Sequence, residues 1–120
     1  MKQDKITKEK IEKYYNITKK ALNIAKKSIP NSKEDTSKKP LGVNSSILTN
    51  KIKQQNETVK VDQAKEIIQM VEYYLSDAKH FEKNKDYINS FGAIYYAHGW
   101  LDCGARLKIF NVTDSTLFTI

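Results

Sequence analysis

Residues 61–83 read VDQAKEIIQMVEYYLSDAKHFEK, and this stretch decides the fold class of the chain. Its apolar positions recur at steps of three and four residues: Ala64, Ile67, Ile68, Val71, Tyr74, Leu75, Ala78 and Phe81. Charged residues such as Lys65, Glu72 and Lys79 occupy positions between them. This spacing places the apolar side chains on one face of an α-helix. We therefore predict an amphipathic helix from about Val61 to Lys83.

A second helix follows directly after this one. The short polar break Asn84-Lys85 before Asp86 predicts a tight helical hairpin, with Asp86 as the N-cap of a helix that runs to about Ile109. The two helices of such a hairpin pack antiparallel.

The helix predicted after Asp86 is apolar nearly all the way round. One side carries Tyr87, Phe91, Ile94, Leu101 and Ala105, and the opposite side carries Tyr96, Trp100, Cys103 and Leu107. Such a helix is buried on more than one face. Either the C-terminal segment with Leu117, Phe118 and Ile120 covers the second side, or a second subunit does so in a homodimer. Gly92, Gly99, Cys103 and Gly104 are poor helix formers, which predicts close packing at these positions.

The N-terminal half supplies one more main helix. Apolar spacing predicts it from about Thr7 to Ser28, and Pro30 ends it. Residues 30–58 have the composition of a polar, partly mobile linker. Within it, Ile47, Leu48 and Ile52 follow two serines and predict one short extra helix. The sequence thus predicts a single all-α domain, a small antiparallel bundle of three main helices: helix 1–29, linker 30–58, and hairpin with C-terminal segment 59–120.

The composition limits the location and the chemistry of the protein. Hydrophobic residues make up 39% of the chain and the mean hydropathy is −0.65. The N-terminus MKQDKITKEK has no apolar core of a signal peptide, and no apolar run is long enough to span a membrane, so we expect a cytoplasmic protein without membrane contact. The single Cys103 can form neither an internal disulfide nor a thiolate zinc site alone. We expect no metal and no cofactor.

The net charge of +7 is unevenly distributed. Residues 1–60 carry 15 Lys against six acids, and residues 61–120 carry six basic residues against eight acids. This asymmetry raises the alternative of a nucleic-acid-associated protein whose Lys13, Lys20, Lys27, Lys38 and Lys39 contact phosphates. The competing interpretation is that surface lysines, abundant through codon usage in an AT-rich genome, only keep the protein soluble.

One polar ridge interrupts the last helix. His98, Asp102 and Arg106 are spaced four residues apart, so their side chains share one face. Asp102 could orient His98 as a general base, or Arg106 could bind an anion, which leaves an enzyme or small-ligand binder as a second alternative. The structural interpretation, which we favour, is that the ridge pairs internally at a helix interface.

Pairing across the hairpin follows from its register. Residues whose numbers sum to about 170 lie opposite one another, which favours salt bridges between Glu72 and His98 and between Glu66 and Arg106. The same register keeps Asp77 and His80 too far along the hairpin to share a metal ion with His98. No phosphate-binding loop, zinc-protease pair or nucleophile elbow occurs, and no catalytic residue is predicted.

The stretch YYLSDA at 73–78, followed by Phe81, Asp86-Tyr87, Phe91 and the run YAHGWLDCGARL at 96–107, resembles an uncharacterised archaeal family. That family is named domain of unknown function 357. The resemblance covers roughly residues 61–120 and implies a compact helical bundle with no established activity or catalytic residues. Occasional fusion of such domains to nucleotidyltransferase-like domains implies an accessory role. The departures are the polar insertion before residue 61 and Cys103, where a small residue is expected.

The function predicted first is a non-enzymatic interaction or accessory module. We expect a protein partner or a homo-oligomer, formed through the last helix with Tyr96, Trp100 and Leu107 at the interface. The feature behind this prediction is that the helix is apolar on all sides.

Overall fold

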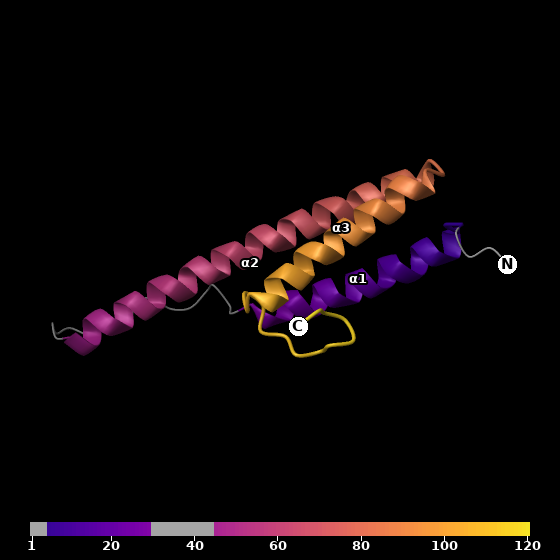
Figure 1. The fold of residues 1–120 in the computed structure, drawn as a ribbon. Helices are drawn as coiled ribbons and strands as arrows, with labels where there is room; N and C mark the ends of the chain where they lie inside the picture. Colours follow the sequence, from indigo (N-terminus) through magenta and orange to yellow (C-terminus); the bar gives the residue numbers. More distant parts are fainter. Residues whose placement is uncertain (1–4, 30–44) are drawn as a thin grey trace.

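The computed structural model describes the backbone of residues 5–29 and 45–120, and within these ranges the side chains of 5–29 and 58–120. Three helices fill most of this part of the chain: α1 (Lys8–Ser28), α2 (Ser45–Lys83) and α3 (Tyr87–Arg106). The described residues contain no strand. α2 and α3 run antiparallel side by side, and α3 also packs along α1 (Figure 1). The predicted all-α helical bundle is confirmed.

α1 is an amphipathic helix with a capped start. The Thr7 hydroxyl accepts a hydrogen bond from the Lys10 backbone N–H at 3.2 Å, which satisfies one of the free donors of the first turn. Ile29 follows the helix with φ −80° and ψ 128°, the extended backbone that a residue before proline favours. The helix predicted from Thr7 to Ser28 is confirmed to within one residue.

α2 is longer than the sequence predicted. It begins at Ser45 instead of near Val61, so the short helix predicted behind the two serines and the helix predicted over 61–83 form one continuous element. The linker predicted over 30–58 is therefore helical from residue 45 onward. Many of its residues, such as lysine and glutamine, form helices readily without an apolar face. Residues 30–44 lie outside the described part of the chain. The N-terminal half of α2 extends beyond α1 and α3 (Figure 1).

The turn from α2 to α3 depends on one residue in the left-handed conformation. Lys85 has φ 61°. The Asp86 N–H donates to the Phe81 carbonyl at 2.8 Å and the Lys85 N–H donates to the Glu82 carbonyl at 2.9 Å, the pair of bonds that closes a helix C-terminus. The Asp86 carboxylate then accepts from the Asn89 backbone N–H at 3.2 Å. Asp86 therefore caps α3, as predicted.

α3 ends at Arg106 rather than near Ile109. Lys108 also has φ 61°, and the Ile109 N–H donates to the Gly104 carbonyl at 2.8 Å. This is the same closing pattern as at Lys85. The backbone conformation at Lys108 therefore ends the helix at Arg106, although the apolar sequence continues to Ile109.

The core lies between the three helices and under the C-terminal segment 107–120. Its larger fully buried side chains are Ile11, Leu22, Val71, Ile94, Leu101 and Phe110. Leu117 and Phe118 are also buried, so the C-terminal segment covers one side of α3. This is not the side that the segment was expected to cover, because Tyr96, Cys103 and Leu107 on the opposite side stay exposed.

Only one glycine of α3 lies at a close contact. A Cβ atom on Gly104 would collide with the Phe110 ring and lie 3.3 Å from Ile67 Cδ1. A Cβ atom on Gly92 or Gly99 would meet nothing within 4 Å. The prediction of tight packing is correct at Gly104 and wrong at Gly92 and Gly99, because these two lie on the exposed side of α3.

Candidate functional site

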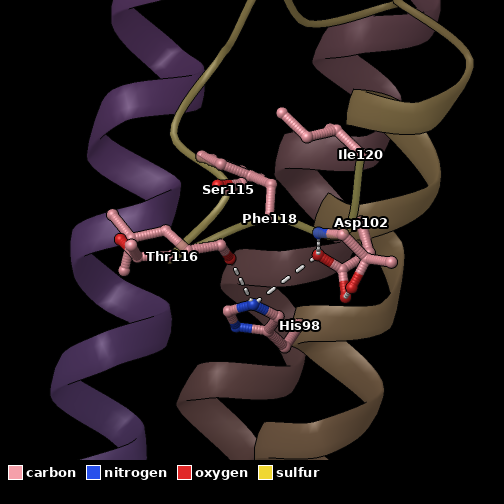
Figure 2. A pocket seen from close by; sticks show the side chains of 8 residues that line it. His98, Asp102, Ser115, Thr116, Phe118 and Ile120 are labelled. Carbon is pink, nitrogen blue, oxygen red and sulfur yellow. Dashed lines mark hydrogen bonds and ion pairs between the residues drawn. The ribbon is translucent and has the colours of Figure 1, made fainter.

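His98 lies where α1, α3 and the C-terminal segment meet. Its Nδ1 is 3.0 Å from Thr18 Oγ1 of α1. Its Nε2 is 2.8 Å from the Leu117 carbonyl oxygen, a contact drawn as a dashed line in Figure 2. A carbonyl oxygen only accepts hydrogen bonds, so Nε2 carries the proton, and in the neutral ring the Thr18 hydroxyl donates to Nδ1. Both ring nitrogens therefore hold other elements against α3.

Asp102 holds the end of the same segment. Its carboxylate accepts from the Thr119 backbone N–H at 2.9 Å and from the Thr119 hydroxyl at 3.2 Å. Asp102 Oδ1 also lies 3.7 Å from His98 Nε2 (Figure 2). Because Nε2 already donates to the Leu117 carbonyl, the closer bonds of Asp102 are those to Thr119.

The third residue of the predicted ridge does not join the other two. Arg106 is exposed and forms no ion pair with Glu66 among the described residues. Glu72 pairs with Lys26 of α1 at 2.5 Å instead of with His98. The two predicted cross-helix pairs are therefore absent among the described residues. Glu72 and His98 have partners on α1 instead, and Glu66 and Arg106 are both exposed.

A hollow of about 510 Å³ lies beside His98 and Asp102, and residues 115–120 form the rest of its lining. Ser115, Thr116, Phe118 and Ile120 surround the two ridge residues in Figure 2. A general base needs a nitrogen or oxygen that is free to take a proton from a substrate. Both nitrogens of His98 are engaged within the chain, so the contacts favour a structural role for His98 and Asp102. This role runs through α1 and the C-terminal segment and not through the predicted internal pairing with Arg106.

The loop that forms this lining is itself organised by Asp114. Hydrogen bonds from the Thr116 hydroxyl at 2.5 Å and from the Thr116 backbone N–H at 2.9 Å hold the pKa of Asp114 below its usual range, and the charge of Lys20 lowers it further. The Leu117 and Phe118 N–H groups donate to the Asp114 carbonyl at 3.2 and 3.1 Å. The side chain of Asp114 holds Thr116, and its backbone carbonyl helps to place Leu117 over His98.

The side of α3 that faces away from α1 and α2 is exposed and largely apolar. We call it the outer face of α3; it consists of Ile88, Gly92, Tyr95, Tyr96, Gly99, Cys103 and Leu107, all exposed. Ile88 is 74% exposed and Leu107 is 63% exposed. Of the predicted interface residues, Tyr96 and Leu107 lie on this face. Trp100 is partly buried at its edge, and its indole Nε1 is buried without a hydrogen-bond partner.

Aromatic contacts border the outer face on both sides. Tyr95 lies 6.0 Å from Tyr14 of α1 and Tyr96 lies 4.6 Å from Tyr74 of α2, as ring centroid distances. Ile88 and Tyr95 also lie on the outer face but are not among the interface residues predicted from the sequence. Ile88 and Tyr95 are seven residues apart, and so are Gly92 and Gly99. This spacing could have assigned Ile88 and Tyr95 to the same helix face as Tyr96.

The lysines predicted to contact phosphates are only partly described. Lys13, Lys20 and Lys27 are exposed and spaced seven residues apart, so they lie along one line on α1. Lys38 and Lys39 lie outside the described residues. The charge of Lys20 lowers the pKa of Asp114, so an acidic residue lies near this line of lysines.

A membrane-spanning helix and a metal-binding group are both absent from the described residues. No helix in ranges 5–29 and 45–120 is long and apolar enough to span a membrane. Among the described side chains of residues 5–29 and 58–120, no group of three or more His, Cys, Asp or Glu is arranged to hold a metal ion.

Residues 42–110 match the profile of a protein family described as protein of unknown function, DUF357. This chain belongs to the DUF357 family. The match begins at residue 42 rather than 61, so it includes the whole of α2, and the polar stretch that sequence analysis treated as an insertion belongs in part to the family region. It ends at Phe110. Comparisons with curated proteins and with solved structures find no significant match.

Proposed function

We propose that this DUF357 protein is a non-enzymatic interaction module that self-associates through the outer face of α3. The observation behind the proposal is that this face stays exposed although the chain's own helices and C-terminal segment cover the rest of α3. Contiguous apolar surface of this kind on a soluble protein usually marks a site of association.

The shape and chemistry of the outer face suit a second copy of itself. Large side chains at Ile88, Tyr95, Tyr96 and Leu107 alternate with Gly92 and Gly99, where a neighbouring side chain has room to enter. Arg106, which is exposed and lies seven residues after Gly99, is a charged residue at the C-terminal end of this face. Two copies related by a two-fold axis would bury aromatic and aliphatic groups against one another, which is the commonest form of protein association.

The non-enzymatic part of the proposal is supported by the state of the polar ridge. His98 and Asp102 are the residues best suited to acid–base chemistry, and both already form hydrogen bonds within the chain. Their partners are Thr18, Leu117 and Thr119. A residue used in this way stabilises the fold and has little freedom to move a substrate proton.

The test is the oligomeric state of the full chain over a wide concentration range, measured by sedimentation equilibrium. We expect a reversible dimer. The double variant Tyr96→Ser/Leu107→Ser should weaken dimerisation at least about tenfold, because large apolar groups at the centre of an interface carry much of its binding energy.

The matched control is Tyr73→Ser. Tyr73 is 65% exposed but lies on α2, outside the outer face, so its loss should leave the dimer unchanged. A chain that is monomeric at all concentrations, or a dimer equally weakened by the control, contradicts the proposal.

A further inference from the structure

A basic hollow lies at the end of the bundle where α1 begins and α2 turns into α3. Its volume is about 440 Å³, and it is lined by Lys8, Lys79, Glu82, Lys83, Lys85 and Tyr87. The start of α1 and the α2–α3 turn lie at the same end of the molecule (Figure 1). This end is opposite to the one where the C-terminal segment leaves α3, so the hollow is separate from the His98 ridge.

The charges around the hollow do not balance. Lys79 lies 3.7 Å from Glu82, and its Nζ also lies 4.2 Å from the centre of the Tyr15 ring of α1. Lys79 and Glu82 therefore each have a partner within the protein. Lys8, Lys83 and Lys85 are exposed, and no ion pair to any of the three occurs among the described residues. Three ammonium groups thus line one hollow without an acidic partner.

The backbone adds to this positive potential. α1 and α3 both begin at this end, and the first N–H groups of a helix carry partial positive charge. The Asp86 carboxylate that caps α3 and Glu9 in the first turn of α1 offset part of this charge. At the C-terminus of α2, where negative charge would gather, the Phe81 and Glu82 carbonyls already accept hydrogen bonds from the turn. The turn also fixes the backbone of Lys85, which lies two residues after Lys83, the other lysine that this turn contributes to the hollow.

We propose that this hollow binds a phosphate-bearing anion, preferably one with two linked phosphates. Gathering three like charges is unfavourable for the free protein, and a multiply charged anion would offset that repulsion. Lysine binds phosphate as a mobile point charge, and the Tyr87 hydroxyl can donate an additional hydrogen bond. The volume is within the range of small-ligand sites, about 300–1,000 Å³. A singly charged carboxylate would offset less of the repulsion.

The experiment is titration of the full-length, isotopically labelled chain with inorganic diphosphate at low salt. Binding is followed by isothermal calorimetry and by amide chemical shifts. We expect saturable binding, with the largest shifts at Lys8 and between Lys83 and Tyr87. Affinity should fall as salt is added, because the interaction is between charges. A parallel titration with a nucleoside diphosphate separates two sources of the same chemistry: tighter binding than inorganic diphosphate identifies a nucleotide, and equal binding identifies the phosphates alone.

Two double variants make the test specific. Lys83→Gln/Lys85→Gln removes two charges from the hollow and should weaken diphosphate binding at least tenfold. Lys19→Gln/Lys65→Gln removes the same charge from exposed positions elsewhere on α1 and α2 and should change affinity less than twofold. Thermal unfolding without ligand checks that both variants fold. Absence of saturable binding, shifts centred elsewhere, or equal loss of affinity in the two variants would overturn the proposal.

Discussion

At the scale of single residues, Gly104 controls how closely α3 approaches the chain that follows it. The Phe110 ring lies against its backbone, with Phe110 Cδ2 only 2.6 Å from the position that a Cβ atom would occupy. Phe110 is 1% exposed, so its ring cannot move aside into solvent. A side chain at position 104 would therefore compress the core even though it would favour the helical backbone.

Gly104→Ala should lower the free energy of unfolding by about 1–3 kcal/mol, the usual effect of overpacking a well-filled core. Gly92→Ala is the matched control. The space above Gly92 is open, so this change should raise the free energy of unfolding by about 0.5–1 kcal/mol through helix propensity. Urea unfolding of both variants measures the difference. If the two substitutions have the same sign, the contact between Gly104 and Phe110 is not as described.

At the scale of elements, the helix ends are set by two lysines in an unfavourable backbone conformation. Lys85 ends α2 and Lys108 ends α3, each with φ 61°. For an L-residue with a Cβ atom this left-handed conformation is strained by roughly 1 kcal/mol, which is why glycine is the common residue at this position. The bundle tolerates the strain because the closing hydrogen bonds of each turn form around these residues.

Lys85→Gly should therefore stabilise the protein by about 0.5–1 kcal/mol, measured by thermal or urea unfolding without added anions. Lys83→Gly provides the contrast. Lys83 is the last residue of α2 and has helical geometry, so glycine there should destabilise by up to about 1 kcal/mol. Destabilisation by Lys85→Gly as large as that by Lys83→Gly would show that position 85 does not adopt the left-handed conformation.

At the scale of the whole molecule, the C-terminal segment belongs to the same cooperative unit as the helices. It contributes Phe110, Leu117 and Phe118 to the core. The hydrogen bonds from His98 to Leu117 and from Thr119 to Asp102 tie its end to α3. A segment held by both buried apolar groups and polar contacts should unfold together with the bundle.

Phe118→Ala should thus destabilise the whole protein by about 3–5 kcal/mol, as expected for removal of a buried phenylalanine. Ile120→Ala, two residues further along and 50% exposed, should change stability by less than about 0.5 kcal/mol. Circular dichroism of the helices and near-ultraviolet signals of the tyrosines should report the same midpoint in each variant. Equal effects of the two substitutions would mean that the segment is not part of the core.

Much of the fold follows from local sequence. The three-to-four spacing of apolar residues predicts α1, the C-terminal half of α2, and α3, and the cap at Asp86 and the break at Asn84-Lys85 predict the hairpin. These features depend on neighbours within one or two helical turns, so the sequence is sufficient to determine them. The start of α2 at Ser45 was not predicted as part of the same helix, because the polar residues that follow lack the apolar period of a packed face.

The candidate sites depend on contacts that the order of residues does not reveal. His98 binds Thr18, 80 residues earlier, and the Leu117 carbonyl, 19 residues later; sequence alone placed it opposite Glu72. The basic hollow joins Lys8 of α1 to the α2–α3 turn, and the outer face of α3 is defined by which sides α1, α2 and the C-terminal segment leave uncovered. The sequence by itself determined the three helices, apart from the start of α2 and the end of α3, since their hydrogen bonds and caps are local. Only the tertiary structure decided which polar groups pair and which apolar face stays exposed, since both depend on packing between distant segments.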